Sequence, residues 1–546
     1  MENKVSAIFE VLNDEQRKAV SCVDGPVLIV AGAGSGKTRV LTSRIAYMLE
    51  RGIEPQRIMA LTFTKKAATE MQERIALMVG SQRARKLVMG TFHSVFVRFL
   101  REYADSIGYP SSFTIFDTYD SVSAIKSIIK EMGLDDKVYK PKSVLSRISA
   151  AKNNLVTASS YRTNTAALTR DAAAKMQRIC DIYTEYAARC RRTGVMDFDD
   201  ILLNMNILLR DNKEALKSIS ERFSHILVDE YQDTNFAQYL IIRKLSAASG
   251  NICVVGDDSQ SIYAFRGARV ENILNFKNDF PNLKMFKLEL NYRSTRTVVG
   301  AANSLIERNP NRIKKKCESA SGDDGEKIRL VRAFSETDEA LQVASHIITK
   351  LTVDKAQYKD FAILYRTNSQ SRAIEEALRK RNLPYQIYSG NSFFDRAEVK
   401  DTMAYLKLVC NPRDDEAFKR TVNKPARGIG DTSLDALQRA ASDMGTSLFK
   451  AIYYPEIEKY GIKPAAIAKI RSFCDMINRM AAAEATTDAY DLATSIVNES
   501  GIYAFFKSDL HHLDSLLCPH FKGANEFLRF VLHIAEHICH ILDNSL

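Results

Sequence analysis

A run of small residues that ends in a lysine and a threonine has the composition of a phosphate-holding loop. The run comprises Ala31, Gly32, Ala33, Gly34, Ser35, Gly36, Lys37 and Thr38, with Arg39 directly after it. Small residues let backbone N–H groups wrap phosphates at a helix N-terminus, while Lys37 can reach the β- and γ-phosphates and Thr38 can ligate Mg²⁺. Ala31 replaces the usual first glycine. A purely structural glycine turn is the alternative, but GSGKT between an apolar run and a helix expected from near Arg39 favours nucleotide binding.

Two adjacent acids close a second apolar run. Asp229 and Glu230 follow His225-Ile226-Leu227-Val228 and open the sequence DEYQD. At the carboxyl edge of a parallel sheet, Asp229 can hold Mg²⁺ through water and Glu230 can polarise an attacking water. Paired acids elsewhere in proteins are usually solvated, but a strand here would bring both to the sheet edge that also carries Lys37.

The elements that must position these residues form an α/β pattern. Short apolar, β-branched runs at 27–30, 58–63, 87–89, 226–228 and 252–255 predict buried parallel strands. Residues 110–194 instead show long helical periodicity with no comparable strand, which predicts a helical insertion. A second α/β region is expected from residue 291, with strands in KIRLVRAF (327–334) and DFAILYRT (360–367), and helices predominate again after Pro384.

Composition limits the classes of protein that fit. A chain of 546 residues predicts several compact units, and a formal charge of +11 favours polyanionic partners. The nine cysteines contain no CxxC pair, which indicates reduced thiols in the cytoplasm. The N-terminus lacks a secretion signal, and no window offers about 18 uninterrupted apolar residues, so we expect no membrane insertion.

Several blocks together resemble the superfamily 1 DNA helicases of the UvrD/Rep/PcrA group. LNDEQRKAV near the start resembles the adenine-recognition segment, which assigns Gln16 to the base, and DEYQD is the group's form of the metal-binding strand. VVGDDSQSIYAFRGA (254–268) resembles the segment that links ATP state to DNA grip. By that likeness Gln260 senses the γ-phosphate, and Tyr263 and Phe265 stack on DNA bases, with Phe265 where the family commonly has Trp.

Three further blocks carry expected roles by the same resemblance. LTFTKKAATEMQERI (61–75) and GTFHSVFVRFL (90–100) resemble single-strand contact segments, which implicates Thr62, Phe63, Thr91 and His93. A core aromatic at the end of a strand is the alternative for Phe63. LELNYRSTRTVVGAAN (288–303) resembles the start of the second motor domain, so Arg293 is an expected arginine finger and Tyr292 an expected adenine-stacking ring.

The resemblance implies an order of domains. We expect a first RecA-like motor domain at 1–108 plus 196–290, interrupted by a helical insertion at 109–195. A partial second RecA-like domain is expected at 291–385, a partial helical accessory domain at 386–509, and a divergent tail at 510–546. The family's Thr-x-His-x-x-Lys-Gly and Tyr-Val-Ala-x-Thr-Arg blocks do not occur in this sequence. We therefore expect a C-terminally truncated motor, slow in hydrolysis and without strand separation on a 3'-tailed duplex.

The tail suggests two interpretations of its histidines and cysteines. Phe527, Phe530, Val531, Ile534, Ile538 and Ile541 have helical spacing, with Asn525 as an expected N-cap. Cys518, His520, His533, His537 and Cys539 include two histidines four residues apart, which a zinc site could use. Without a regular ligand framework, solvated or packed histidines are the favoured interpretation.

The expected function is an ATP-dependent DNA helicase that uses ATP and Mg²⁺. The resemblance implies 3'-to-5' movement, single-stranded and tailed duplex DNA as partners, and an association with repair or replication proteins. A truncated chain that binds ATP or DNA without working as a motor is the alternative. A P-loop kinase or transporter ATPase is disfavoured by DEYQD and QSIYAFRGA.

Overall fold

The computed structural model describes residues 2–388, 397–484 and 486–506. The expectations for the tail at 510–546, including its helix and its histidines, lie outside these residues. The chain divides into two compact units. One joins the chain up to Asp323 with the chain from Lys400 onward, and the other is Asp324–Val399.

A six-stranded sheet forms the centre of the larger unit, and all of its strand pairs are parallel. The strand order is β3-β2-β6-β7-β1-β8. The strands are β1 (Val27–Ala31), β2 (Ile58–Thr62), β3 (Val88–Thr91), β6 (His225–Val228), β7 (Ile252–Gly256) and β8 (Lys284–Leu288). The carboxyl ends of these strands therefore share one edge, where loops gather functional residues.

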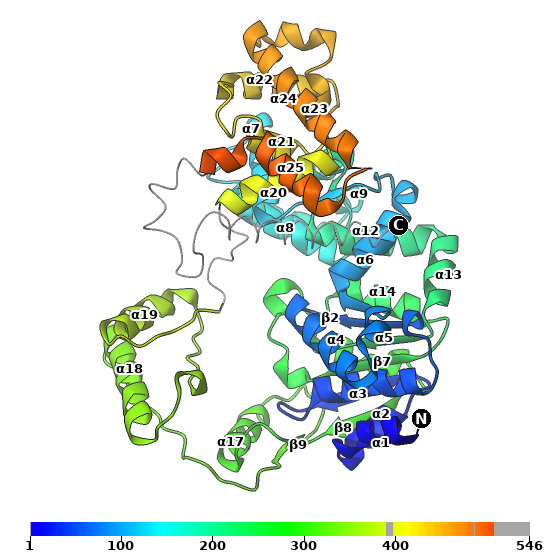
Figure 1. Ribbon diagram of the computed structural model, residues 1–546, viewed down its shortest axis with the longest axis vertical. Helices are drawn as coiled ribbons and strands as arrows, with labels where there is room; N and C mark the ends of the chain where they lie inside the picture. Colours follow the sequence, from blue (N-terminus) through cyan, green and yellow to red (C-terminus); the bar gives the residue numbers. More distant parts are fainter. Residues whose placement is uncertain (1, 389–396, 485, 507–546) are drawn as a thin grey trace. The chain divides into compact units, whose positions relative to one another are not determined.

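Helices cover both faces of the sheet, so the strands are buried on both sides (Figure 1). Within β1, Leu28 and Val30 pack on one face, while Val27, Ile29 and Ala31 pack on the other. The first face is covered by α6 (Phe92–Glu102), α12 (Phe198–Asp211), α13 (Lys213–Arg222) and α14 (Phe236–Ser246). The second is covered by α1 (Glu2–Glu10), α2 (Asp14–Ser21), α3 (Lys37–Glu50), α4 (Lys65–Val79) and α5 (Ser81–Arg85).

The five predicted apolar runs are confirmed as strands, with ends that differ by one or two residues. The edge strand β8 was not predicted, because its sequence KMFKL mixes lysines with apolar residues and three of its five positions are exposed. The helix expected near Arg39 begins at Lys37.

The predicted helical insertion is confirmed. It contains α7 (Thr118–Glu131), α8 (Pro141–Asn153), α9 (Ala158–Tyr161), α10 (Thr165–Ala173) and α11 (Ile179–Thr193), which share one apolar core. We expected no strand comparable to those of the central sheet in 110–194, and the structure adds only one short strand there. The two-residue strand β4 (Thr114–Ile115) pairs with β5 (Val195–Met196), because the insertion's entry and exit must run side by side to return the chain to the sheet.

A second helical group follows residue 400 and packs on the insertion. It contains α20 (Ala397–Cys410), α21 (Asp415–Thr421), α22 (Asp431–Asp443), α23 (Leu448–Ala451), α24 (Pro464–Ala483) and α25 (Ala489–Glu499). Asn411 Nδ2 donates to the carbonyls of Thr193 and Gly194 at 3.0 and 2.9 Å, and Thr114 Oγ1 donates to Asp414 Oδ2 at 2.7 Å. These buried bonds join the entry and the exit of the insertion to the loop between α20 and α21.

The smaller unit is built on α18 (Glu336–Val353) and α19 (Ser371–Lys380), which pack on each other. The strands predicted at 327–334 and 360–367 were wrong, because neither segment forms a β-strand in the structure. Both segments have apolar sequences, yet Leu330, Phe334 and Leu364 are 97%, 102% and 94% exposed. A strand needs a hydrogen-bonded neighbour, and no described segment pairs with either one.

Candidate functional site

The phosphate-type loop lies between β1 and α3 at the carboxyl edge of the sheet. Ala31 ends β1 and is fully buried in the core, which explains how this position accommodates a methyl group. A Cβ on Gly32 would lie 2.2 Å from Cys317 Sγ, so any larger residue there would force that thiol to move. Gly36 has a φ of 87° and precedes Lys37, the first residue of α3. The loop therefore presents the N-terminus of α3, as the sequence predicted.

The segment after β8 is fastened to this loop. The Tyr292 N–H donates to the Gly34 carbonyl at 2.9 Å, and Asn291 Nδ2 donates to the Ala33 carbonyl at 2.6 Å. A Cβ on Gly34 would lie 2.7 Å from Arg293 Cβ, so glycine is needed there as well. These contacts bring the expected arginine finger and the expected adenine-stacking ring to the loop.

A cavity of about 520 Å³ opens where these elements meet. Its lining residues are Gly34, Gly36, Lys37, Thr38, Arg39, Glu70, Arg74, Glu230, Gln260, Tyr292 and Arg293. Nine of the eleven were predicted from the sequence, all but Glu70 and Arg74. Glu70 and Arg74 lie one turn apart on α4, within the block 61–75 that was assigned to single-strand contact. Their i and i+4 spacing resembles any solvated ion pair, so neither was assigned to the cavity.

The two acids after β6 differ in environment. Glu230 Oε2 lies 2.9 Å from Lys37 Nζ, with side chains 36% and 12% exposed. Glu230 has a φ of 48°, a left-handed conformation that is costly for a residue with a side chain and is often found at functional sites. Asp229 is only 4% exposed, and burial together with the nearby Glu230 raises the pKa of its carboxyl to about 6, which Lys37 partly offsets.

Hydrogen bonds connect Glu230 to Gln260 through a buried glutamine. Gln232, which is 1% exposed, donates from Nε2 to Glu230 Oε2 at 2.8 Å, and its Oε1 accepts from the Asp257 N–H at 3.1 Å. Asp257 Oδ2 in turn accepts from Gln260 Nε2 at 2.6 Å. The loops after β6 and β7 are therefore held in one polar network at the cavity.

Residues expected at the adenine end have defined positions. Tyr292 is exposed, its hydroxyl accepts from Asn13 Nδ2 at 2.8 Å, and the Arg39 guanidinium lies 6.0 Å from its ring centre. Gln16 is fully buried. Its Oε1 accepts from the Asn13 N–H at 3.1 Å, and its Nε2 donates to the Ser35 carbonyl at 2.9 Å. In this conformation Gln16 supports the loop backbone, and its contact with a base stays a prediction.

Two aromatic rings stand exposed on the loop that follows Gln260. Phe265 is 78% and Tyr263 36% exposed, and their ring centres are 5.9 Å apart. The Arg266 guanidinium lies 5.5 Å from each ring centre. A cation beside two accessible rings offers stacking faces for bases and charge for a phosphate backbone.

The four other expected DNA contacts are less accessible. Thr62 is 2% exposed, so its hydroxyl offers little surface. Phe63 is half-buried with its ring centre 5.3 Å from that of Phe92, so it packs against the core, and its contact with DNA stays a prediction. Thr91 caps α6 by accepting from the Ser94 N–H at 3.2 Å. Burial lowers the pKa of His93 to about 4, so its imidazole is neutral near pH 7.

Comparison with known proteins identifies one family over nearly the whole described chain. The UvrD/REP helicase N-terminal domain model matches residues 12–281, and the UvrD-like helicase C-terminal domain model matches residues 286–493. The chain belongs to the UvrD/REP helicase family. The matched range ends inside the helical group, so the family assignment covers the sheet, the insertion and both sides of the cavity.

Relatives within the UvrD/REP helicase family include proteins named ATP-dependent DNA helicase PcrA. Those of Bacillus subtilis and Leuconostoc citreum are 42% and 41% identical to this chain over 499 and 498 residues. The PcrA of Staphylococcus aureus is 39% identical over 498 residues. Each match covers 91% of this chain but only 65% to 67% of the relative, so the chain spans about two thirds of their length.

Proposed function

We propose that this chain is the motor portion of an ATP-dependent DNA helicase that moves 3' to 5' on single-stranded DNA. The observation that carries the proposal is the cavity in which Lys37, Glu230 and Arg293 meet beside the N-terminus of α3. Loop N–H groups and the helix N-terminus suit phosphates, and the two cations suit the charge that develops during phosphoryl transfer. Family membership and the names of the PcrA relatives support the choice of ATP and DNA.

Breaking the Lys37–Glu230 ion pair is the proposed first step of ATP hydrolysis. The ammonium that neutralises Glu230 in this structure is also the cation best placed for the β- and γ-phosphates. When Lys37 turns to the phosphates, the Glu230 carboxylate is released to accept a proton from water. Gln232 then keeps the carboxylate oriented, since its Nε2 donates to the same Oε2 at 2.8 Å.

Thr38 and Asp229 are the proposed protein contacts of Mg²⁺. Hydroxyl and carboxylate oxygens are the hard donors that this ion prefers, and it usually keeps several waters besides nucleotide phosphates. Among the described residues, no cluster of three or more His, Cys, Asp and Glu side chains could hold a metal ion by itself. A site of two protein oxygens completed by phosphates and water needs no such cluster. Bound Mg²⁺ would neutralise charge on the phosphates.

Tyr263 and Phe265 are the proposed stacking platform for single-stranded DNA. Tailed duplexes are the proposed substrates, and repair or replication proteins the proposed partners. No helix in the described part of the chain is long and apolar enough to cross a membrane. The seven cysteines of that part form no disulfide, which supports a cytoplasmic location as part of the proposal.

Steady-state ATP hydrolysis with and without a single-stranded oligonucleotide tests the proposal. We expect turnover that rises with DNA and is lost, together with ATP affinity, in Lys37→Ala. Equal ATP affinity of the parent and Lys37→Ala in an equilibrium titration would remove the nucleotide assignment. ATP binding without any hydrolysis would instead favour a chain that binds but does not work as a motor.

A further inference from the structure

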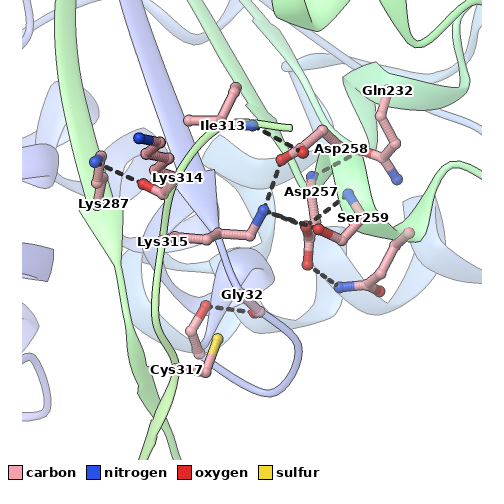
Figure 2. Close-up of polar contacts among 12 residues, drawn as sticks. Gly32, Gln232, Asp257, Asp258, Ser259, Lys287, Ile313, Lys314, Lys315 and Cys317 are labelled. Atoms are coloured by element: carbon pink, nitrogen blue, oxygen red, sulfur yellow. Dashed lines mark hydrogen bonds and ion pairs between the residues drawn. The ribbon is translucent and has the colours of Figure 1, made fainter. Parts of the chain in front are cut away.

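A buried lysine, Lys315, contacts the loop that follows β7 (Figure 2). Lys315 Nζ lies 2.8 Å from Asp257 Oδ1, 2.6 Å from Asp258 Oδ1 and 3.2 Å from Ser259 Oγ. The lysine side chain is 6% exposed, and those of Asp257 and Asp258 are 3% and 1% exposed. An ion cluster so shielded from water holds its geometry far better than a surface pair.

The two oxygens of Asp257 face different partners. Oδ1 receives the Lys315 ammonium and the Ser259 N–H at 3.0 Å, whereas Oδ2 accepts from Gln260 Nε2 at 2.6 Å. A carboxylate is rigid and planar, so fixing Oδ1 also fixes Oδ2. The Gln260 amide carries two hydrogens on Nε2, and Asp257 takes one of them. The other remains for an oxygen in the cavity that Gln260 lines.

The positions of the Asp257 and Asp258 carboxylates depend on the positive charge of Lys315. Two adjacent carboxylates share one ammonium, and without it they would repel each other in a buried site. Burial disfavours the charged lysine, but the attraction of Asp257 and Asp258 outweighs it and raises the pKa of Lys315. The ammonium is therefore present throughout the physiological range.

The segment that carries Lys315 also touches the phosphate loop. The Ile313 N–H donates to Asp258 Oδ2 at 3.1 Å, and Lys287 Nζ donates to the Lys314 carbonyl at 2.7 Å (Figure 2). Two residues beyond Lys315, the Cys317 thiol packs against Gly32. Residues 313–317 therefore contact both the phosphate loop and the loop that carries Gln260.

We propose that Lys315 is a positioning residue for recognition of the γ-phosphate, because its ammonium fixes Asp257 and Asp257 directs the Gln260 amide into the cavity. The inference rests on the proposed function, in which Gln260 contacts the γ-phosphate. Lys315 does not line the cavity and touches no phosphate itself. Its contribution is therefore specific to nucleotides that carry a γ-phosphate.

Equilibrium titrations with ADP and with ATPγS, a slowly hydrolysed ATP analogue, separate this role from simple structural support. In Lys315→Met we expect the preference for ATPγS over ADP to fall about tenfold, the loss of one charge-assisted contact, with ADP affinity unchanged. Gln260→Ala should lose the same preference, and the double variant should lose no more than either. Lys314→Met is the matched control, because it makes the same change at a neighbouring, exposed side chain.

A second variant controls for misfolding, because Lys315→Met alone leaves two buried carboxylates without a cation. Lys315→Met/Asp258→Asn keeps the net charge of the buried cluster but still leaves Asp257 without its cation, so it should show the same loss of preference as Lys315→Met. An unchanged ATPγS preference, or an equal loss of ADP and ATPγS affinity, in both variants would overturn the inference. If the parent and Lys37→Ala bind nucleotide alike, the proposed function fails instead.

Discussion

At the residue scale, Glu230 and Lys37 neutralise each other across the cavity. In the proposed function each takes a separate role when nucleotide binds. Glu230→Gln keeps the size of the side chain but removes the base. We expect Mg-ATP binding to be retained and hydrolysis to fall about 10²- to 10⁴-fold. Parallel measurements of ATP affinity and of turnover check this expectation. Turnover equal to that of the parent would remove Glu230 from the chemistry.

The exposed ring of Phe265 gives a test of DNA binding that leaves the fold alone. Phe265→Ala should weaken single-stranded DNA binding by about 1–3 kcal/mol, the range for one base–aromatic stack. Melting temperature should not change, because the ring is 78% exposed. Tyr490→Ala, at an exposed tyrosine of α25, is the control. Equal DNA affinity of Phe265→Ala and the control, in a fluorescence anisotropy titration, would contradict the stacking role.

The sequence predicted residues that belong to local motifs and missed those that act through tertiary contact. Lys37, Glu230 and Gln260 each lie within a recognisable block, and all three line the cavity. Lys315 lies in a run of three lysines, a pattern that usually means a solvated surface, and only the fold shows that the middle one is buried against two aspartates. Cys317 is likewise one of nine scattered cysteines in the sequence, and only the structure shows that its thiol lies next to Gly32.

At the scale of elements, apolar β-branched runs predicted the central strands because those strands are buried on both faces. The same signal failed at 327–334 and 360–367, since hydropathy reports that a segment prefers burial but not which neighbour it pairs with. It also failed at β8, an edge strand in which Lys284 and Met285 are exposed.

A buried carboxyl near the start of α21 predicts a pH-dependent stability of the C-terminal helical group. Burial raises the pKa of Asp415 to about 7, and its Oδ1 accepts from the Leu448 N–H at 2.8 Å. Because the pKa is about 3.9 when unfolded, the folded state binds the proton more tightly. The resulting contribution to stability is full below about pH 4 and is lost as the pH rises towards 7.

Asp415→Asn imitates the protonated carboxyl and keeps an acceptor for the Leu448 N–H. We expect the variant to be more stable than the parent at pH 8, by about 1–3 kcal/mol, with a smaller gain at pH 5. Urea unfolding followed at both pH values measures the difference. A gain that does not depend on pH would show that Asp415 does not hold a proton in the folded state.

At the scale of the whole molecule, one loop joins the proposed nucleotide cavity to the exposed rings of Tyr263 and Phe265. Gln260 lines the cavity, and Tyr263 and Phe265 follow it by three and five residues. The far end of this loop is tied back to the loop after β6, where the Arg269 N–H and Asn272 Nδ2 both donate to the Thr234 carbonyl at 2.9 Å. We therefore propose that nucleotide binding at Gln260 alters the position of the Tyr263 and Phe265 rings through this short loop.

The affinity for a single-stranded oligonucleotide, measured with saturating ATPγS and again with saturating ADP, tests this coupling most directly. We expect affinities that differ by about 5- to 150-fold, the usual range of coupling between two sites on one protein. We also expect Gln260→Ala to remove the difference while nucleotide still binds. Equal DNA affinity of the parent in the two nucleotide states, with both nucleotides shown to be bound, would contradict the claim that this cavity controls the grip on DNA.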